Sequence, residues 1–336
     1  MDPDSAIRST DSDAAQARLS AVNKGYLEDP FIAYFVPRAR FLSPRPPLIN
    51  VGTFVRATAI DTLVHQWIDI NPESQIVSLG AGSDTRFWRL SAQSRISRVR
   101  HYVEVDFPEN TARKTAIIRK TPSLSQYLLG VVRTEQGGMA LRATNYTLIP
   151  ADLRLPPAAT LGPLLTGDTL SPNIPTLFIS ECVFAYMPKA SSDALINWFS
   201  ENFEITAGAL YEMFGLNDPF GKIMRQNLMS RNVSLPGVDA YPALDSQRER
   251  YLNASFSHAN ALSLKRVRWS HIPPAEASRI AALEMLDEVE ELDLVLEHYV
   301  VAWGVKVPDK EAGPGDLIGW GLKENPSVPV NEGWEG

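Results

Sequence analysis

The stretch QIVSLGAGSDTRFWRL, residues 75–90, is the clearest indication of the fold class of this chain. Residues 75–80 are a short apolar run that ends in glycine, which is typical of a buried strand leading into a tight turn. A second glycine, Gly82, follows after one intervening residue. In parallel α/β sheets, glycines at this place let a ligand come close to the backbone. Because two glycines alone are a weak signal, a plain strand-to-helix turn is the alternative.

The apolar run belongs to a longer alternation of strand-like and helix-like segments between residues 75 and 214. This order predicts an α/β fold with a parallel sheet and helices on both faces. Ligands of such sheets bind beyond the carboxyl ends of the strands. The predicted strands are 75–80, 100–108, 145–153, 174–187 and 208–214, and the predicted helices are 54–70, 110–120 and 191–203.

The flanking segments are less regular. The polar and acidic residues 1–16 are expected to be disordered, and the Gly/Pro-rich tail 308–336 is expected to be extended or mobile. The main domain then covers 17–307. Two segments inside it interrupt the alternation, and we expect 17–50 to form lid elements and 217–270 to form an inserted lid subdomain, because loops on a rigid scaffold commonly supply specificity.

Composition and charge exclude several classes of protein. The chain has 336 residues, a net charge of −7 and one cysteine, Cys182, so no intrachain disulfide bond is expected. The acidity argues against a nucleic-acid partner, and no apolar run approaches the ~18 residues of a membrane span. The N-terminus lacks the charged-then-apolar order of a signal peptide. The five histidines show no metal-ligand spacing. We expect a cytoplasmic protein, present also in the nucleus, without a metal.

The turn around Gly80 and Gly82, called the glycine turn below, also limits which class of ligand can bind. A dinucleotide fingerprint requires a third glycine, and this chain has Thr85 at that position. The acid that would bind a ribose is present, since Asp106 lies 24 residues after Gly82 at the end of the next predicted strand. This combination suits a ligand with one ribose and no pyrophosphate. S-adenosylmethionine is such a ligand.

Three predicted strands end in acidic residues, which suggests three contacts to that ligand. Asp106 suits the ribose diol, because a carboxylate accepts two hydrogen bonds. Asp152, or the backbone of Leu153, suits the adenine amino group, and Glu181 suits the ammonium or sulfonium end. For each acid taken alone, a helix N-cap or a surface ion pair is the alternative interpretation.

Together, several segments resemble the leucine carboxyl methyltransferases, from about residue 13 to about residue 305. The glycine turn lies between GTFVR and ISECVFAYM, and that order is specific. The resemblance implies a Rossmann-like class I methyltransferase sheet, S-adenosylmethionine as methyl donor, and a monomer. It implies methylation of the C-terminal leucine carboxylate of the type-2A serine/threonine phosphatase catalytic subunit. The matching segments are DAAQARLSAVNKGYLEDPFI, INVGTFVRATAID, QIVSLGAGSDTRFWRL, YVEVDFPENTARK, ADLR, PTLFISECVFAYM, NDPFGKIMRQNL and ALEMLDEVEELDLVLEHY.

The resemblance also assigns roles to individual residues. Arg18 stands where the family usually has lysine, so the charge is kept while the geometry differs. Many methyltransferases carry an acid two residues before the first glycine, but this chain has Ser78 there. The cofactor-binding residues implied by the resemblance are Arg18, Arg56, Gly80, Asp106, Asp152, Leu153 and Glu181, and the residues implied at the reacting carboxylate are Arg56 and Tyr186.

A carboxylate is already a nucleophile at neutral pH, so the reaction needs no general base. Arg56 can hold either the carboxylate of the cofactor or that of the substrate, and the resemblance favours the cofactor. Tyr186 is expected to donate to the substrate carboxylate, with simple packing as its alternative. Cys182 is interpreted as a packing residue.

Two rival functions remain at this stage. One is a related enzyme that methylates a carboxylate on a modified tRNA base or on a small metabolite. The other is a non-catalytic protein that binds the phosphatase, although a pure scaffold would not need a cofactor cleft.

Overall fold

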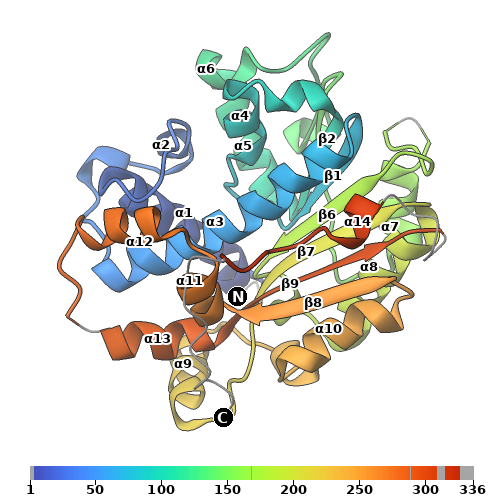
Figure 1. The fold of residues 1–336 in the computed structure, drawn as a ribbon. Coiled ribbons are helices and arrows are strands. Elements are labelled where there is room, and N and C mark those ends of the chain that lie inside the picture. Colours follow the sequence, from blue (N-terminus) through green and yellow to red (C-terminus); the bar gives the residue numbers. More distant parts are fainter. Residues whose placement is uncertain (1–3, 168, 288, 309–314, 326–336) are drawn as a thin grey trace.

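The computed structural model describes residues 4–167, 169–287, 289–308 and 315–325. Within these residues nine strands form one sheet in the order β3-β4-β5-β2-β1-β6-β7-β9-β8, with helices on both faces (Figure 1). The strands are β1 (Ser74–Leu79), β2 (Val99–Asp106), β3 (Arg133–Glu135), β4 (Ala140–Arg142), β5 (Tyr146–Pro150), β6 (Thr176–Glu181), β7 (Thr206–Met213), β8 (His258–Ser263) and β9 (Tyr299–Lys306).

The centre of the sheet is parallel, as the alternating sequence pattern predicts. Strand β1 pairs in parallel with β2 on one side and with β6 on the other, and β5 and β7 continue the parallel order outward. The order of strands therefore reverses beside β1, which is where ligands of open α/β sheets bind. Strand β9 enters antiparallel between β7 and β8, and β3 and β4 add an antiparallel edge. The predicted α/β fold class is confirmed.

Helices cover the sheet because each of its faces carries an apolar cluster. On one face α3, α4 and α13 contribute side chains to a cluster that includes Trp67, Phe87 and Trp88, and on the other α7, α8 and α10 contribute to a cluster that includes Phe178 and Tyr251. The helices are α1 (Ser5–Asn23), α2 (Ile32–Phe35), α3 (Pro47–Ile70), α4 (Arg86–Ala92), α5 (Pro108–Lys120), α6 (Pro122–Ser125), α7 (Pro157–Leu165), α8 (Lys189–Asn202), α9 (Pro219–Ser230), α10 (Leu244–Asn253), α11 (Leu264–Ser270), α12 (Pro274–Ala281), α13 (Val289–Glu297) and α14 (Gly315–Ile318). Short 3-10 turns are η1 (Ala39–Phe41), η2 (Arg95–Arg98), η3 (Gln136–Gly138), η4 (Phe184–Tyr186) and η5 (Val238–Ala240).

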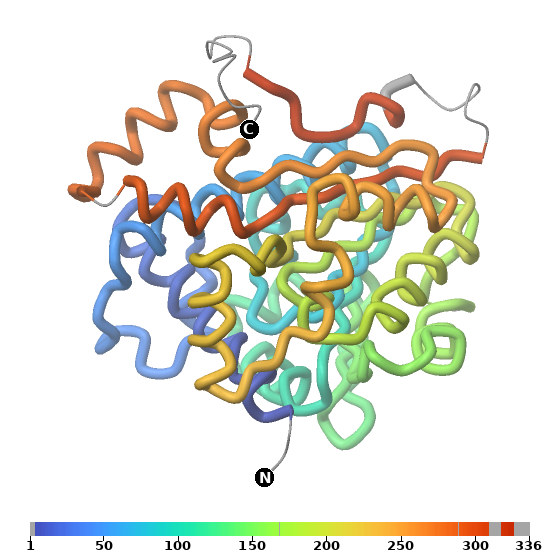
Figure 2. Tube along the Cα trace, turned by 90° about the horizontal axis from the view of Figure 1, so that it is seen from below, coloured from blue at the N-terminus to red at the C-terminus, as the bar shows by residue number. Residues whose placement is uncertain are grey.

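The expectation that residues 1–16 are disordered is wrong for residues 5–16, which belong to helix α1. Acidic residues at this end pair with arginines on the body of the protein: Asp4 binds Arg154, with N–O distances of 2.7 Å, and Asp13 binds Arg231 on the helix α9 side. Figure 2 shows the N-terminal segment (dark blue) beside the segment that contains α9. The acidic residues that suggested disorder therefore form ion pairs that attach helix α1 to the rest of the protein. Residues 1–3 lie outside the described residues.

The segment 217–270 is also more closely joined to the main domain than an inserted subdomain would be. Its strand β8 is the edge strand of the main sheet, and Tyr251 on α10 is fully buried against the sheet. Gly208 and Gly304 make room for that ring, because a Cβ at either position would collide with Tyr251. Only α9 stays on the periphery, with Gly221 as its one buried residue.

Part of the C-terminal tail is packed rather than mobile. Trp320 is buried with its ring edge-on to Trp67, 5.7 Å between centroids, and its indole N–H donates to the Leu63 carbonyl at 2.9 Å. The expectation of an extended or mobile tail is therefore wrong around Trp320, because two large apolar rings lose contact with water here. Residues 309–314 and 326–336 of the predicted tail lie outside the described residues.

Candidate active site

A cavity of about 350 Å³ opens at the carboxyl ends of the parallel strands, beside β1. Residues from four strand ends line it together with residues from α1, α3 and α9. The structure thus gathers into one cavity residues that are spread over most of the sequence. All of the predicted site residues line this cavity, namely Arg18, Arg56, Gly80, Asp106, Asp152, Leu153, Glu181 and Tyr186.

The glycine turn after β1 has the left-handed backbone that glycine adopts without cost. The φ angles are +63° at Gly80 and +45° at Gly82. The space beside each Cα is taken by the protein itself, because a Cβ at Gly80 would collide with Val183 and one at Gly82 would collide with Asp11. The glycines therefore allow close packing of the turn against two other segments, in addition to the approach of a ligand that the sequence pattern suggested.

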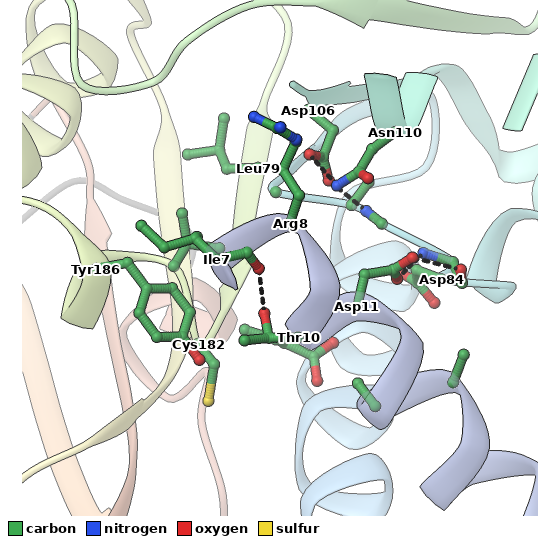
Figure 3. Close-up of a pocket in the computed structure, with 18 of the residues that line it drawn as sticks. Ile7, Arg8, Thr10, Asp11, Leu79, Asp84, Asp106, Asn110, Cys182 and Tyr186 are labelled. Carbon is green, nitrogen blue, oxygen red and sulfur yellow. Dashed lines mark hydrogen bonds between the residues drawn. The ribbon is translucent and has the colours of Figure 1, made fainter. Parts of the chain in front are cut away.

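Helix α1 closes one side of the cavity. The carboxylate of Asp11 accepts from the backbone N–H of Ser83 at 2.6 Å and from its hydroxyl at 2.9 Å, and it also pairs with Arg113. Figure 3 shows Arg8 of this helix extending toward Asp106, and Asp11 directed toward the side where Asp84 lies. No local sequence signal identified this wall, because the partners of Asp11 lie 72 and 102 residues away.

Asp106 is held in a fixed orientation beside the turn. Its Oδ2 atom accepts from Gly82 N at 2.6 Å, and its Oδ1 atom accepts from Phe107 N at 2.6 Å and from Asn110 Nδ2 at 2.9 Å. Burial raises the pKa of this carboxyl group, and these hydrogen bonds oppose the shift. A carboxylate that is oriented by the backbone and borders the cavity is well placed to accept from a ribose diol.

The predicted adenine side of the cavity is formed by the residues after β5. Arg154 donates to both carboxylate oxygens of Asp152, at 2.9 and 2.7 Å, and these hydrogen bonds are the main cause of the lowered pKa of Asp152. The Arg154 guanidinium also lies 5.3 Å from the ring centroid of Phe107, another residue of the cavity wall. Asp152 is thus fixed by its neighbour, and Leu153 supplies an apolar surface next to it.

Glu181, at the end of β6, is held by two arginines. Arg56 Nε donates to its Oε2 atom at 2.7 Å, and Arg86 donates to its Oε1 atom at 2.8 Å. The Arg56 guanidinium also stacks 4.5 Å from the ring centroid of Tyr211. Burial opposes the charge of Glu181, but Arg56 and Arg86 outweigh burial and lower its pKa to about 2. Glu181 therefore keeps its negative charge at neutral pH and fixes the position of Arg56.

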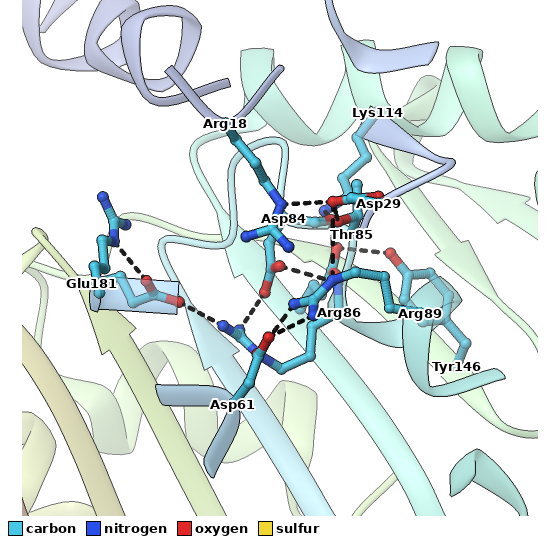
Figure 4. A network of polar contacts seen from close by, with 12 residues as sticks. Arg18, Asp29, Asp61, Asp84, Thr85, Arg86, Arg89, Lys114, Tyr146 and Glu181 are labelled. Atoms are coloured by element: carbon cyan, nitrogen blue, oxygen red, sulfur yellow. Dashed lines mark hydrogen bonds and ion pairs between the residues drawn. The ribbon is translucent and has the colours of Figure 1, made fainter. Parts of the chain in front are cut away.

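A buried polar network below the cavity was not identified from the sequence, although part of it lies in the stretch at 84–89 (Figure 4). Arg86, with a side chain only 3% exposed, binds the carboxylates of Asp61, Asp84 and Glu181. Asp61 in turn binds Arg89. The available signal was the presence of two arginines among apolar residues directly after the glycine turn, since buried charges require partners.

Arg18 extends this network to the cavity. Its Nε atom donates to Asp29 at 2.5 Å, and the same carboxylate accepts from the hydroxyl of Thr85 at 2.5 Å. The Nη2 atom of Arg18 is buried and has no hydrogen-bond partner. Because a buried donor without a partner is costly, this atom suggests a ligand that supplies an acceptor.

The turn η4 carries the other predicted catalytic residue. Tyr186 borders the cavity together with Cys182 (Figure 3). Cys182 has a left-handed φ of 55°, and burial raises the pKa of its thiol. A thiol kept protonated in this way is a poor nucleophile, which is consistent with the packing role expected for Cys182.

The ion pairs of Glu181 make stability depend on pH. A depressed pKa means that Glu181 stabilises the folded state above its ordinary pKa of 4.5, and that this contribution is lost as the pH falls toward about 2. The loss amounts to roughly 3 kcal/mol at 1.36 kcal/mol per unit. We expect the free energy of unfolding, measured with urea between about pH 5 and pH 3, to fall more steeply in the native chain than in Glu181→Gln. Equal slopes would show that the Glu181 pairs do not stabilise the fold.

Two further properties concern the described residues alone. None of their helices has the length and apolarity needed to cross a membrane. Nor do their His, Cys, Asp and Glu side chains form any group of three or more that could hold a metal ion.

The reversal of strand order beside β1, the antiparallel β9 and the cavity at the acid-ended strands are the features of a class I methyltransferase that uses S-adenosylmethionine. The family model for leucine carboxyl methyltransferase matches residues 6–200. This chain belongs to that family, as the sequence motifs indicated.

Relatives of that family match this chain over most of their length. Leucine carboxyl methyltransferase 1 of Cryptococcus neoformans is 43% identical, with 90% of this chain and 94% of the relative covered. The protein of that name from Bos taurus is 36% identical, with 90% of each chain covered. A homolog from Arabidopsis thaliana is 34% identical, with 89% of each chain covered.

Proposed function

We propose that this protein methylates the α-carboxylate of the C-terminal leucine of the type-2A phosphatase catalytic subunit. The observation that carries the proposal is Arg56 on the cavity wall, held in place by Glu181 and the Tyr211 ring, because a fixed guanidinium group beside an apolar wall suits a carboxylate with an aliphatic side chain. The names of the family and its relatives support the leucine, and the phosphatase follows from the sequence resemblance.

The residues of the cavity fit S-adenosylmethionine in three respects. The oriented Asp106 suits the ribose, the Leu153 and Phe107 side chains suit the adenine, and the unpartnered Nη2 atom of Arg18 suits the carboxylate of the methionine moiety. S-adenosylmethionine supplies an activated methyl group, which a carboxylate takes up without a general base. The protein's own residues therefore have to bind, orient and exclude water.

At the acceptor end Arg56 and Tyr186 are the proposed contacts. Arg56 is held by Glu181 and by the Tyr211 ring, so its remaining donors face a defined direction. Met213 and Leu228 add an apolar surface to the same cavity, which suits the isobutyl group of a leucine. The sequence left open which of the two carboxylates Arg56 holds, and the resemblance favoured that of the cofactor; we place Arg56 at the carboxylate of the substrate.

We assign docking of the phosphatase to the segments 17–50 and 217–270, which were predicted to form the lid. Both contribute to the cavity, through Arg18 and through Leu228 on α9. Both also expose large apolar side chains, with Phe41 86% exposed and Met229 61% exposed. We further propose that the protein acts as a monomer in the cytoplasm and the nucleus.

The proposal is tested by methyl incorporation from tritiated S-adenosylmethionine. We expect the phosphatase catalytic subunit, or a peptide of its C-terminal tail, to be labelled, and we expect labelling to disappear when the last leucine is removed or its carboxylate is amidated. Labelling that survives the loss of the leucine, or labelling of tRNA or a small carboxylic acid instead, would exclude this function. Binding of the phosphatase without any labelling would indicate the non-catalytic alternative.

A further inference from the structure

The acceptor side of the cavity depends on one short segment, residues 181–187, which links β6 to α8. Glu181, Val183 and Tyr186 of this segment all border the cavity. The segment turns sharply, with Cys182 in a left-handed conformation at φ 55°, and continues into the 3-10 turn η4. Cys182 N donates to Tyr211 O, Tyr186 N to Val183 O and Met187 N to Phe184 O, which leaves the N–H groups of residues 183–185 to be satisfied by other acceptors.

Glu212 is the group that holds this turn. Its carboxylate, 2% exposed on β7, accepts hydrogen bonds from three successive backbone N–H groups. Oε1 accepts from Val183 N at 3.0 Å and from Phe184 N at 2.8 Å, and Oε2 accepts from Ala185 N at 3.1 Å. Side chains alternate along a strand, so Glu212 lies on the other face of β7 from Tyr211, which stacks on Arg56.

The turn is also clamped from the segment 217–270. Gly237 N donates to the Ala185 carbonyl at 3.0 Å, and a Cβ at Gly237 would collide with the Phe184 carbonyl oxygen. The guanidinium of Arg250 lies 5.1 Å from the Phe184 ring centroid. Arg250 also lies close enough to Glu212 to favour its charged form. The turn is therefore held by the carboxylate of Glu212 on one side and packed against the backbone of Gly237 on the other.

We propose that Glu212 is a positioning residue for methyl transfer, which places Tyr186 at the acceptor end of the cavity by holding the backbone of residues 183–185. Glu212 does not border the cavity and touches no substrate, so it acts through the turn. The inference rests on the proposed methyl transfer, but it holds for any acceptor that is bound at Tyr186. Because a displacement of about 1 Å at a reacting centre can cost on the order of 100-fold in rate, a loosened turn should reduce catalysis strongly.

The cofactor side should be affected much less. The glycine turn has hydrogen bonds of its own, from Gly80 N to Val105 O at 2.8 Å and from Gly82 N to the carboxylate of Asp106 at 2.6 Å. Val183 packs beside Gly80, but none of the N–H groups bound by Glu212 belongs to the glycine turn. A positioning role at the acceptor end therefore predicts that turnover and cofactor affinity respond differently to changes at Glu212.

The test compares Glu212→Gln and Glu212→Ala with the native protein in the tritiated-methyl assay and in calorimetry with S-adenosylhomocysteine. Glutamine keeps one acceptor oxygen and presents an amide where Ala185 N donates, whereas alanine keeps no acceptor. We expect kcat to fall about tenfold in Glu212→Gln and about 100-fold in Glu212→Ala, with the Kd of S-adenosylhomocysteine within about threefold of native in both. If Glu212→Ala does not fold, the inference is tested by Glu212→Gln alone, in which kcat should fall while the Kd of S-adenosylhomocysteine stays close to native.

Two further variants separate positioning from general stability. Leu165→Ala truncates a fully buried side chain on α7 that does not border the cavity, so it should lower Tm and leave kcat close to native. In Gly237→Ala the new methyl group would collide with the turn from the side opposite Glu212. This variant should therefore lower kcat as Glu212→Gln does. Native kcat in Glu212→Gln, or equal losses of kcat and cofactor affinity, would overturn the inference. A native protein that labels no leucine-terminated substrate would instead contradict the proposed function.

Discussion

Arg56→Ala is expected to lower methyl transfer by about 100-fold or more while the protein stays folded. Arg56 borders the cavity and is held by Glu181 at 2.7 Å and by the Tyr211 ring. Its loss removes charged hydrogen bonds to a carboxylate, and two such bonds at about 1.5 kcal/mol each correspond to this factor. The fold should persist because Glu181 keeps its hydrogen bond to Arg86 at 2.8 Å.

The loss of activity is measured as the rate of methyl transfer, and the retained fold is checked by circular-dichroism melting curves. Arg98→Ala is a suitable control for the loss of an arginine, since Arg98 forms a surface ion pair with Asp69 at 2.9 Å and does not border the cavity. Arg56→Lys keeps the charge but loses the planar fork, so it should recover only part of the rate. Unaltered turnover in Arg56→Ala would remove Arg56 from the site.

Asp106→Ala is expected to weaken the binding of S-adenosylmethionine by about 100-fold. The lost carboxylate would otherwise accept two hydrogen bonds from the ribose diol, at about 1.5 kcal/mol or more each. It also releases Gly82 N, which it binds at 2.6 Å, so the glycine turn itself is loosened. The lost hydrogen bonds and the loosened turn both weaken the binding of the cofactor, and neither alters the reactivity of its methyl group.

Isothermal calorimetry with S-adenosylmethionine measures this effect directly. Asp69→Ala removes a surface carboxylate that pairs with Arg95 and Arg98 away from the cavity, and its affinity should be native. Asp106→Asn keeps one acceptor oxygen and should bind with intermediate affinity. A native affinity in Asp106→Ala would show that the ribose lies elsewhere.

Several features of the fold were predictable because their signals are local. The parallel strands were recognised from apolar runs that end in acids or glycine, and β1 is buried along its whole length, as such a run requires. Three of the antiparallel strands were not recognised: β3 and β4 are only three residues long, and β8 is an edge strand with a mixed burial pattern. Short or edge strands carry little periodicity, so their pairing depends on neighbours that the local pattern does not reveal.

The same distinction applies to the site. Asp106, Asp152 and Glu181 were found because a strand end is a sequence position, and the fold brings all of these strand ends to one cavity. Arg86 and Glu212 were missed because their roles arise from distant partners. Arg86 meets Glu181, 95 residues away, and Glu212 meets a turn 27 to 29 residues earlier in the chain.

The sequence by itself determined the class of ligand and the alternation of strand and helix that makes the centre of the sheet parallel, since both follow from residue types at short spacings. Only the tertiary structure decided that the acidic N-terminus is a helix which closes the cavity through Asp11. It alone decided that the glycines at 80 and 82 make room for Val183 and Asp11 as well as for a ligand. The physical reason is that charge pairing and close packing depend on distances in space, whereas a sequence pattern records only distances along the chain.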